Sequence, residues 1–232
     1  MLPLDLNRVV FTGSNFLIYN ISDLLPRHRH FPFGSDVLNP NTGMKEVLGS
    51  YKEAPGRNIN HIITHQTLGG YGVADKQVFR TGEFFVKDPN WKQKGTKWVW
   101  TGEGRGWPGF AYTWFVPFSP LVYYTDAGER LIIYQCNSLD LITWHTGFGM
   151  NSNGGGLAFQ GYFLEEDAGV KTPLKGTDGE PSEAQLEILP AFWLEYGVPV
   201  LGASTLTGHW EHGKHSCPGR TLREKVCEIR GH

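Results

Sequence analysis

The chain has 232 residues, a net charge of −2 at pH 7 and 40% hydrophobic residues, which is enough apolar material for one sizeable core. Lysine and arginine are scattered and no run of about 18 apolar residues occurs, so we expect neither nucleic-acid binding nor membrane insertion. Three cysteines are too few for a disulfide framework. Because the first residues do not resemble a secretory signal, we expect synthesis in the cytoplasm.

The N-terminal quarter of the chain is expected to be a largely irregular extension, residues 1–56. It contains the stretch RHRHFPFGSDVLNPNTG, in which prolines, glycines and asparagines predict turns. His28 and His30 in this stretch are candidate metal ligands, but an exposed arm is the simpler interpretation. The main domain is therefore expected to span residues 57–232.

The main domain mixes patterns typical of strands with patterns typical of helices. Continuous apolar runs predict strands, whereas leucines and aromatic residues spaced three and four apart predict helices. Ser182 is the expected N-cap of one helix, and Pro190 inside it predicts a kink or a split. An α/β fold around one central sheet follows. The expected strands are residues 58–65, 110–118, 121–126, 129–136 and 155–163, and the expected helices are residues 72–88, 182–197 and 221–230.

Two histidines and a cysteine are candidate ligands of a metal ion. His65 ends a predicted strand, and His209 and Cys217 frame the stretch GHWEHGKHSCPG, eight residues apart. Zinc binds neutral imidazole and thiolate, and a catalytic zinc keeps three protein ligands with a fourth position for water. Lys214 and His215 would favour the thiolate form of the cysteine. Each of these residue types is more often structural, so spacing alone does not decide between a zinc site and unrelated side chains.

Five short motifs follow one another between residues 58 and 230: IITHQT, WPGFAYTWFV, WHTGFGMNSNGGGLAFQGYF, SEAQLEIL and GHWEHGKHSCPG. In this order they resemble the zinc-dependent N-acetylmuramoyl-L-alanine amidases, including phage endolysins, that share a fold with peptidoglycan recognition proteins. The resemblance implies a single α/β domain with a central mixed β-sheet flanked by helices. It also implies a hydrolase of the amide between N-acetylmuramic acid and L-alanine, with Zn²⁺ as cofactor and cell-wall peptidoglycan as partner.

The resemblance also implies roles for individual residues. His65, His209 and Cys217 match the zinc ligands of the family, and Tyr112 matches its active-site tyrosine. His215 stands where the family often has a lysine, and it is the expected partner of the oxyanion that forms from the substrate carbonyl. Three further residues are expected to bind substrate: His145, Trp107 and Asn151.

Two of these assignments leave alternatives open. Trp107 belongs to a segment with four tryptophans that could line a glycan groove or pack beneath a long loop. His145 could form part of the substrate wall, support the metal ligands from behind, or be a buried structural residue. His212, between the predicted ligands, is expected to be a solvated loop residue.

Besides His215, the chain departs from the family pattern at three positions. Gln66 and Thr113 stand where the family has histidine, and Trp210 stands where it has arginine. A protein of the same fold that binds peptidoglycan without cutting it is therefore an alternative, although such proteins usually lack the cysteine ligand.

A second alternative is a cysteine peptidase in which Cys217 is the nucleophile and His209 or His145 is its base. The chain retains both this cysteine and Tyr112, which favours the zinc hydrolase. For that enzyme we expect a monomer that acts on the cell wall after release.

Overall fold

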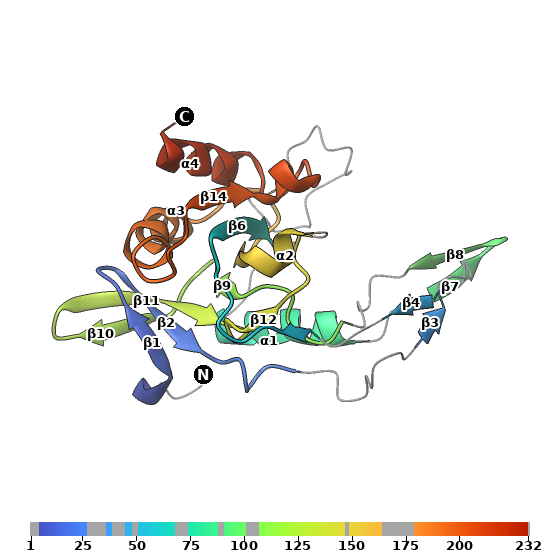
Figure 1. Ribbon diagram of the computed structural model, residues 1–232, viewed down its shortest axis with the longest axis horizontal. Coiled ribbons are helices and arrows are strands. Elements are labelled where there is room, and N and C mark those ends of the chain that lie inside the picture. The colour runs from blue at the N-terminus through green and yellow to red at the C-terminus, as the bar shows by residue number, and fades with distance from the viewer. Residues whose placement is uncertain are drawn as a thin grey trace.

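The centre of the computed structural model is a mixed sheet with the strand order β1-β2-β11-β9-β13-β6-β14, and β10 also pairs with β11 (Figure 1). The structure describes residues 5–26, 36–38, 45–47, 51–67, 74–87, 91–100, 107–146, 149–163 and 179–231. The strands of the sheet are β1 (Val9–Thr12), β2 (Phe16–Asn20), β6 (His61–Gln66), β9 (Trp114–Val116), β10 (Val122–Thr125), β11 (Gly128–Gln135), β13 (Gly154–Phe159) and β14 (Thr205–Gly208).

Helices and three small sheets complete the described part of the chain. The helices are α1 (Ala74–Val86), α2 (Met150–Asn153), α3 (Glu183–Ala191) and α4 (Arg220–Arg230), with 3-10 turns η1 (Leu6–Arg8) and η4 (His209–His212) and a π-helical segment η3 (Phe192–Gly197). Three two-stranded sheets pair β3 (Asp36–Leu38) with β4 (Lys45–Val47), β5 (Lys52–Glu53) with β12 (Leu141–Ile142), and β7 (Trp91–Lys94) with β8 (Lys97–Trp100). The expected fold class, a central mixed sheet flanked by helices, is confirmed.

Alternation along the strands divides the core into two layers, because successive side chains of a strand point to opposite faces. In β2, Phe16 and Ile18 belong to the layer beneath α3 and α4, whereas Leu17 and Tyr19 belong to the layer against α1. Figure 1 shows α3 and α4 on one side of the sheet and α1 on the other. The sheet is therefore covered on both faces, as its nearly continuous apolar strands require.

The predicted strands and helices of the main domain are confirmed, with bounds shifted by a few residues. The helix expected to begin after Ser182 does so through a capping box, in which the Ser182 hydroxyl accepts from Gln185 N at 3.3 Å and the Gln185 side chain accepts from Ser182 N at 3.2 Å. The split expected at Pro190 is also found, because α3 ends at Ala191 and a π-helical segment follows. His28 and His30 lie outside the described residues.

The N-terminal residues 9–20 differ from the irregular extension that we expected. They form β1 and β2, and β2 pairs in parallel with β11 in the main sheet. The apolar run FLIYN explains this outcome, since four of its five residues are buried in the sheet. The turn between the two strands is held by Glu195, whose carboxylate accepts from the amide and the hydroxyl of Ser14. The domain boundary at residue 56 stays a prediction.

A helix that crosses a membrane needs about 20 mostly apolar residues. Among the described residues, none of the helices combines the length and the apolar character that a membrane span requires.

Replacement of Gly155 in β13 by alanine should destabilise the fold. A Cβ atom at this position would lie 2.8 Å from Cη2 of Trp114, whose side chain is fully buried. We expect Gly155→Ala to lower the free energy of unfolding by about 1–3 kcal/mol, as overpacking of a core does. Urea denaturation would measure it, with Leu194→Ala as the control, since Leu194 is 65% exposed. Equal stabilities of the two variants would contradict the packing of Trp114 against β13.

Candidate metal centre

The parallel pairing of β6 and β14 brings His65 and His209 together. Thr64 of β6 lies opposite Gly208 of β14. The residues that follow them, His65 and His209, therefore also lie beside each other. The centroids of their rings are 4.5 Å apart. Carboxyl ends of neighbouring parallel strands meet at one edge of a sheet, which is where ligands bind in many α/β folds. Two residues 144 positions apart in sequence therefore share one site.

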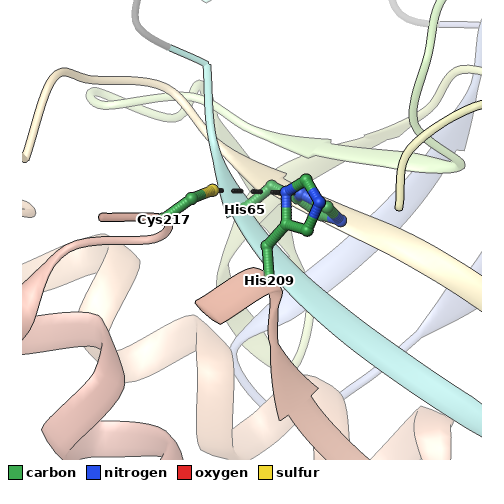
Figure 2. Close-up of side chains that lie close together, drawn as sticks. All are labelled: His65, His209 and Cys217. Carbon is green, nitrogen blue, oxygen red and sulfur yellow. Dashed lines mark hydrogen bonds between the residues drawn. The ribbon is translucent and has the colours of Figure 1, made fainter. Parts of the chain in front are cut away.

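Cys217 completes the cluster from the loop that precedes α4. Its Sγ lies 4.0 Å from Nδ1 of His65, and one ligand atom from each of His65, His209 and Cys217 lies within 4.8 Å of the other two. Figure 2 shows the three side chains turned toward one another. Within the described ranges, this is the one cluster of three or more metal-ligating side chains.

His145 fixes the hydrogen-bonding state of His65. Nε2 of His145 lies 3.2 Å from the carbonyl oxygen of Gly154, and a carbonyl can only accept, so Nε2 of His145 holds a hydrogen. Burial lowers the pKa of His145 to about 3, so its ring is neutral and its Nδ1 is an acceptor. Nε2 of His65, 3.2 Å from that Nδ1, must then be the donor. His65 is left with an unprotonated Nδ1 facing Cys217, which is the state that binds a metal.

The glycine-rich strand β13 makes room for His145. A Cβ atom on Gly156 would lie 3.0 Å from Cγ of His145, and one on Gly154 would lie 3.4 Å from its Cε1. The ring therefore packs directly on the backbone of β13, with His65 on the neighbouring strand within reach. Gly154 and Gly156 thus leave space for His145 on one face of the strand, whereas Gly155 between them faces Trp114.

Asn151 and Arg57 hold the chain on which His145 sits. The Oδ1 atom of Asn151 accepts hydrogen bonds from the amides of His145 and Thr146, at 3.1 and 2.9 Å. The guanidinium of Arg57 donates to the carbonyls of Leu139, Asn151, Ser152 and Gly154. No motif in the sequence marks Arg57, so its role is visible only in the fold.

Burial keeps the cluster neutral before a metal binds. Burial, and then the neighbouring His145 and His209, hold the pKa of His65 well below its usual value. Burial also lowers the pKa of His209 to about 4, against the opposing effect of the Thr146 carbonyl. The same cause raises the pKa of Cys217 to about 12, against the amide of Gln66 and the charge of Lys214. Two neutral imidazoles and one thiol that loses its proton on binding form a donor set that fits zinc.

The remaining predicted residues lie around this cluster at different depths. Tyr112 is half-buried, with its ring centroid 4.9 Å from that of His65. Trp107 is half-buried and stacks on Phe85, with ring centroids 5.2 Å apart and planes at 10°. His215 is exposed, and its backbone carbonyl accepts from Arg223 Nη2 at 2.5 Å. The catalytic roles of Tyr112 and His215 and the substrate-binding role of Trp107 stay predictions.

Three further side chains near the cluster, those of His145, Asn151 and His212, are largely engaged in contacts within the protein. His145 is only 5% exposed and its ring bonds to His65, so the substrate contact expected for it stays a prediction. The side-chain oxygen of Asn151 is used within the protein, as described above, so its expected contact with substrate stays a prediction. His212 is half-buried, and its Nε2 lies 3.1 Å from the hydroxyl of Thr207, so it is not the solvated loop residue that we expected.

Comparisons with known proteins identify the fold. A comparison with protein-family models finds no match, and a comparison with curated protein sequences finds none either. Among solved structures, the endolysin N-acetylmuramoyl-L-alanine amidase LysCS from Clostridium intestinale has a TM-score of 0.51 at 16% identity, over 94% of this chain and 99% of that chain. The ectodomain complex of peptidoglycan recognition proteins LCa and LCx with tracheal cytotoxin has a TM-score of 0.52 at 18% identity, over 78% of this chain and 87% of that chain.

A third structure, that of Drosophila peptidoglycan recognition protein SD, has a TM-score of 0.50 at 15% identity, over 78% of this chain and 85% of that chain. Identities this low establish likeness of fold. The chain thus has the fold that an endolysin amidase and peptidoglycan recognition proteins share, and His65, His209 and Cys217 resemble a zinc site within it.

Replacement of His145 should weaken metal binding. In His145→Phe a ring of similar size replaces the imidazole, so Nε2 of His65 loses its acceptor and the His65 ring is no longer held in the metal-binding state. We expect the dissociation constant for zinc to rise about 10- to 100-fold, as loss of a hydrogen-bond partner of a metal ligand usually causes. Competition with a chromophoric chelator would measure it.

The control for this measurement is His212→Phe. His212 is a histidine near the cluster that bonds to Thr207 and to none of the three ligands in the described contacts. Zinc affinity of this variant should stay at the wild-type level. A wild-type affinity of His145→Phe would show that the hydrogen bond to His65 does not set the state of the ligand.

Proposed function

We propose that the protein is a zinc-dependent N-acetylmuramoyl-L-alanine amidase that hydrolyses the amide between N-acetylmuramic acid and L-alanine in peptidoglycan. One observation supports this most strongly: His65, His209 and Cys217 converge at the carboxyl edge of a sheet whose fold is found in an endolysin amidase. Three protein ligands leave a fourth position for water, which is typical of catalytic zinc, whereas structural zinc usually has four protein ligands.

The roles of the chain's own residues follow from their places around the cluster. Zinc, when bound by His65, His209 and Cys217, would lower the pKa of a water molecule to about 7 and polarise the substrate carbonyl. Tyr112, whose ring lies beside that of His65, is the residue that passes a proton from the attacking water to the leaving amine. The exposed imidazole of His215 stands on the loop between two ligands and stabilises the oxyanion there.

The burial of Cys217 disfavours the cysteine peptidase alternative. A nucleophilic cysteine needs a thiolate at neutral pH, and such thiolates are found beside cations with a lowered pKa. Burial raises the pKa of Cys217 to about 12, so this sulfur becomes a thiolate through metal binding rather than as a free nucleophile.

The proposed enzyme acts on the cell wall after release from the cell in which it is made. A peptidoglycan-binding protein without activity is the second candidate, because peptidoglycan recognition proteins share the fold and a complex of two of them is solved with tracheal cytotoxin bound. The presence of the cysteine in the cluster favours the enzyme over this candidate.

Purified peptidoglycan distinguishes the two candidates. We expect the zinc-loaded protein to release stem peptides with a free N-terminal alanine, detected by mass spectrometry. Removal of zinc with a chelator should abolish release, addition of zinc should restore it, and Cys217→Ser should release none. Binding to the wall without release of peptides would support the recognition protein, and full activity of a sample shown to be metal-free would refute the role of zinc.

Removal of the Tyr112 hydroxyl should slow the reaction without loss of metal. Because a positioned proton donor contributes about 10²- to 10⁴-fold, we expect Tyr112→Phe to lower kcat by at least about 10²-fold. Its zinc content, measured by atomic absorption, should stay at the wild-type level. Tyr123→Phe is the control, since Tyr123 lies in β10, which pairs with β11 and is separated from β6 by β11, β9 and β13. A wild-type kcat in Tyr112→Phe would remove this tyrosine from the mechanism.

A further inference from the structure

Gln66 immediately follows the ligand His65 and connects three segments of the chain. Its side chain is 2% exposed. Its Nε2 donates to the carbonyl of Ser216 at 2.9 Å, and its Oε1 accepts from the amide of Phe163 at 2.5 Å. Its own backbone amide donates to Sγ of Cys217 at 3.4 Å. Gln66 thus contacts two consecutive residues of the loop that carries the third ligand, Ser216 and Cys217.

The path of that loop explains why it needs such a residue. Ile62 belongs to the core layer beneath α3 and α4, so alternation along β6 places His65 on the opposite face of the sheet. Helix α4, which follows Cys217, packs on the layer beneath α3. The chain must therefore pass the end of β6 to bring the sulfur from the α4 side to His65. Gln66 is the last residue of β6, at the place where the loop passes.

Phe163, in the segment after β13, contacts both Gln66 and the loop that carries Cys217. Phe163, whose amide binds Gln66, lies so close to the loop that a Cβ atom on Gly219 would be 2.6 Å from its Cβ. The amide group of Gln66 offers a donor and an acceptor at once, and it uses the donor on the loop and the acceptor on Phe163. Neither a carboxylate nor an apolar side chain of similar length can make both bonds.

We propose that Gln66 is a positioning residue of the metal centre, which holds Cys217 at ligand distance by fastening its loop to the end of β6. The inference rests on the proposed zinc site. The two bonds to Ser216 and Phe163 fix the loop, and the backbone amide that points at the sulfur stabilises the negative charge of the thiolate. Its effect is on the affinity for metal and on the metal–sulfur bond.

Cobalt(II) is the probe for this role, because it accepts the same ligands as zinc and its thiolate charge-transfer absorption reports the metal–sulfur bond. In Gln66→Met, we expect the dissociation constant for Co²⁺ to rise at least about 10-fold, the range of losses when partners of metal ligands are removed. We also expect weaker charge-transfer absorption at saturation. In its ionised form, Gln66→Glu keeps the acceptor for Phe163 but loses the donor to Ser216, so above the pKa of that carboxyl it should show the same defect even if Gln66→Met folds poorly.

The matched control is Gln185→Met. Gln185 is also fully buried, and its Nε2 donates to the carbonyls of Val116 and Gln160, at 3.1 and 3.0 Å. Its loss should lower the melting temperature about as much as Gln66→Met does, because both variants leave buried carbonyls without a donor. Its affinity for Co²⁺ and its absorption should stay at the wild-type level.

The outcomes separate this inference from the proposed function. A wild-type protein that binds neither Co²⁺ nor Zn²⁺ would overturn the metal centre and the positioning role together. Wild-type binding and absorption in both Gln66 variants would overturn the positioning role alone, and the zinc site would stand. Equal losses of Co²⁺ affinity in Gln66→Met and Gln185→Met would show that reduced stability alone weakens metal binding. That result would also overturn the positioning role.

Discussion

The parallel pairing of β6 with β14 is the constraint on which the candidate site depends. Because Thr64 lies opposite Gly208, the two histidines that follow must come out of the sheet at the same edge. The pairing is itself held by burial on both faces, with Ile62 and Leu206 in one core layer. Any change in register between these strands would separate the imidazoles. The geometry of the cluster therefore depends directly on the pairing that stabilises the sheet.

A chain of hydrogen bonds extends this order from the sheet to the ligands. It runs from the carbonyl of Gly154 through His145 to His65, and each link fixes the direction of the next. Arg57 donates to the same Gly154 carbonyl, at 3.4 Å. Buried polar groups are costly unless they are paired, so this chain has few alternative arrangements. His65, which is fully buried, consequently keeps one ring orientation, with its Nδ1 toward Cys217.

The sequence predicts much of this fold, because long apolar runs, a capping box and an internal proline leave few choices for the main domain. The ligands were found from a resemblance of motifs, since the spacing of His65 from His209 has no local meaning and depends on strand pairing. Gln66 stood out only as a departure from the family pattern. Its contacts lie across three separate segments, which no local pattern reveals. The first strands were missed because the turn-rich stretch after them dominated the composition of that region.

The pairing of β2 with β11 has a consequence for any shortened form of the protein. β2 covers residues 131–135 of β11 on the side away from β9 and β10. A chain that starts after residue 20 would leave those backbone amides and carbonyls without partners on a flat, apolar strand. Unprotected edges of this kind recruit strands from other molecules. Truncation at the amino end would then produce self-association and precipitation, not a smaller folded domain.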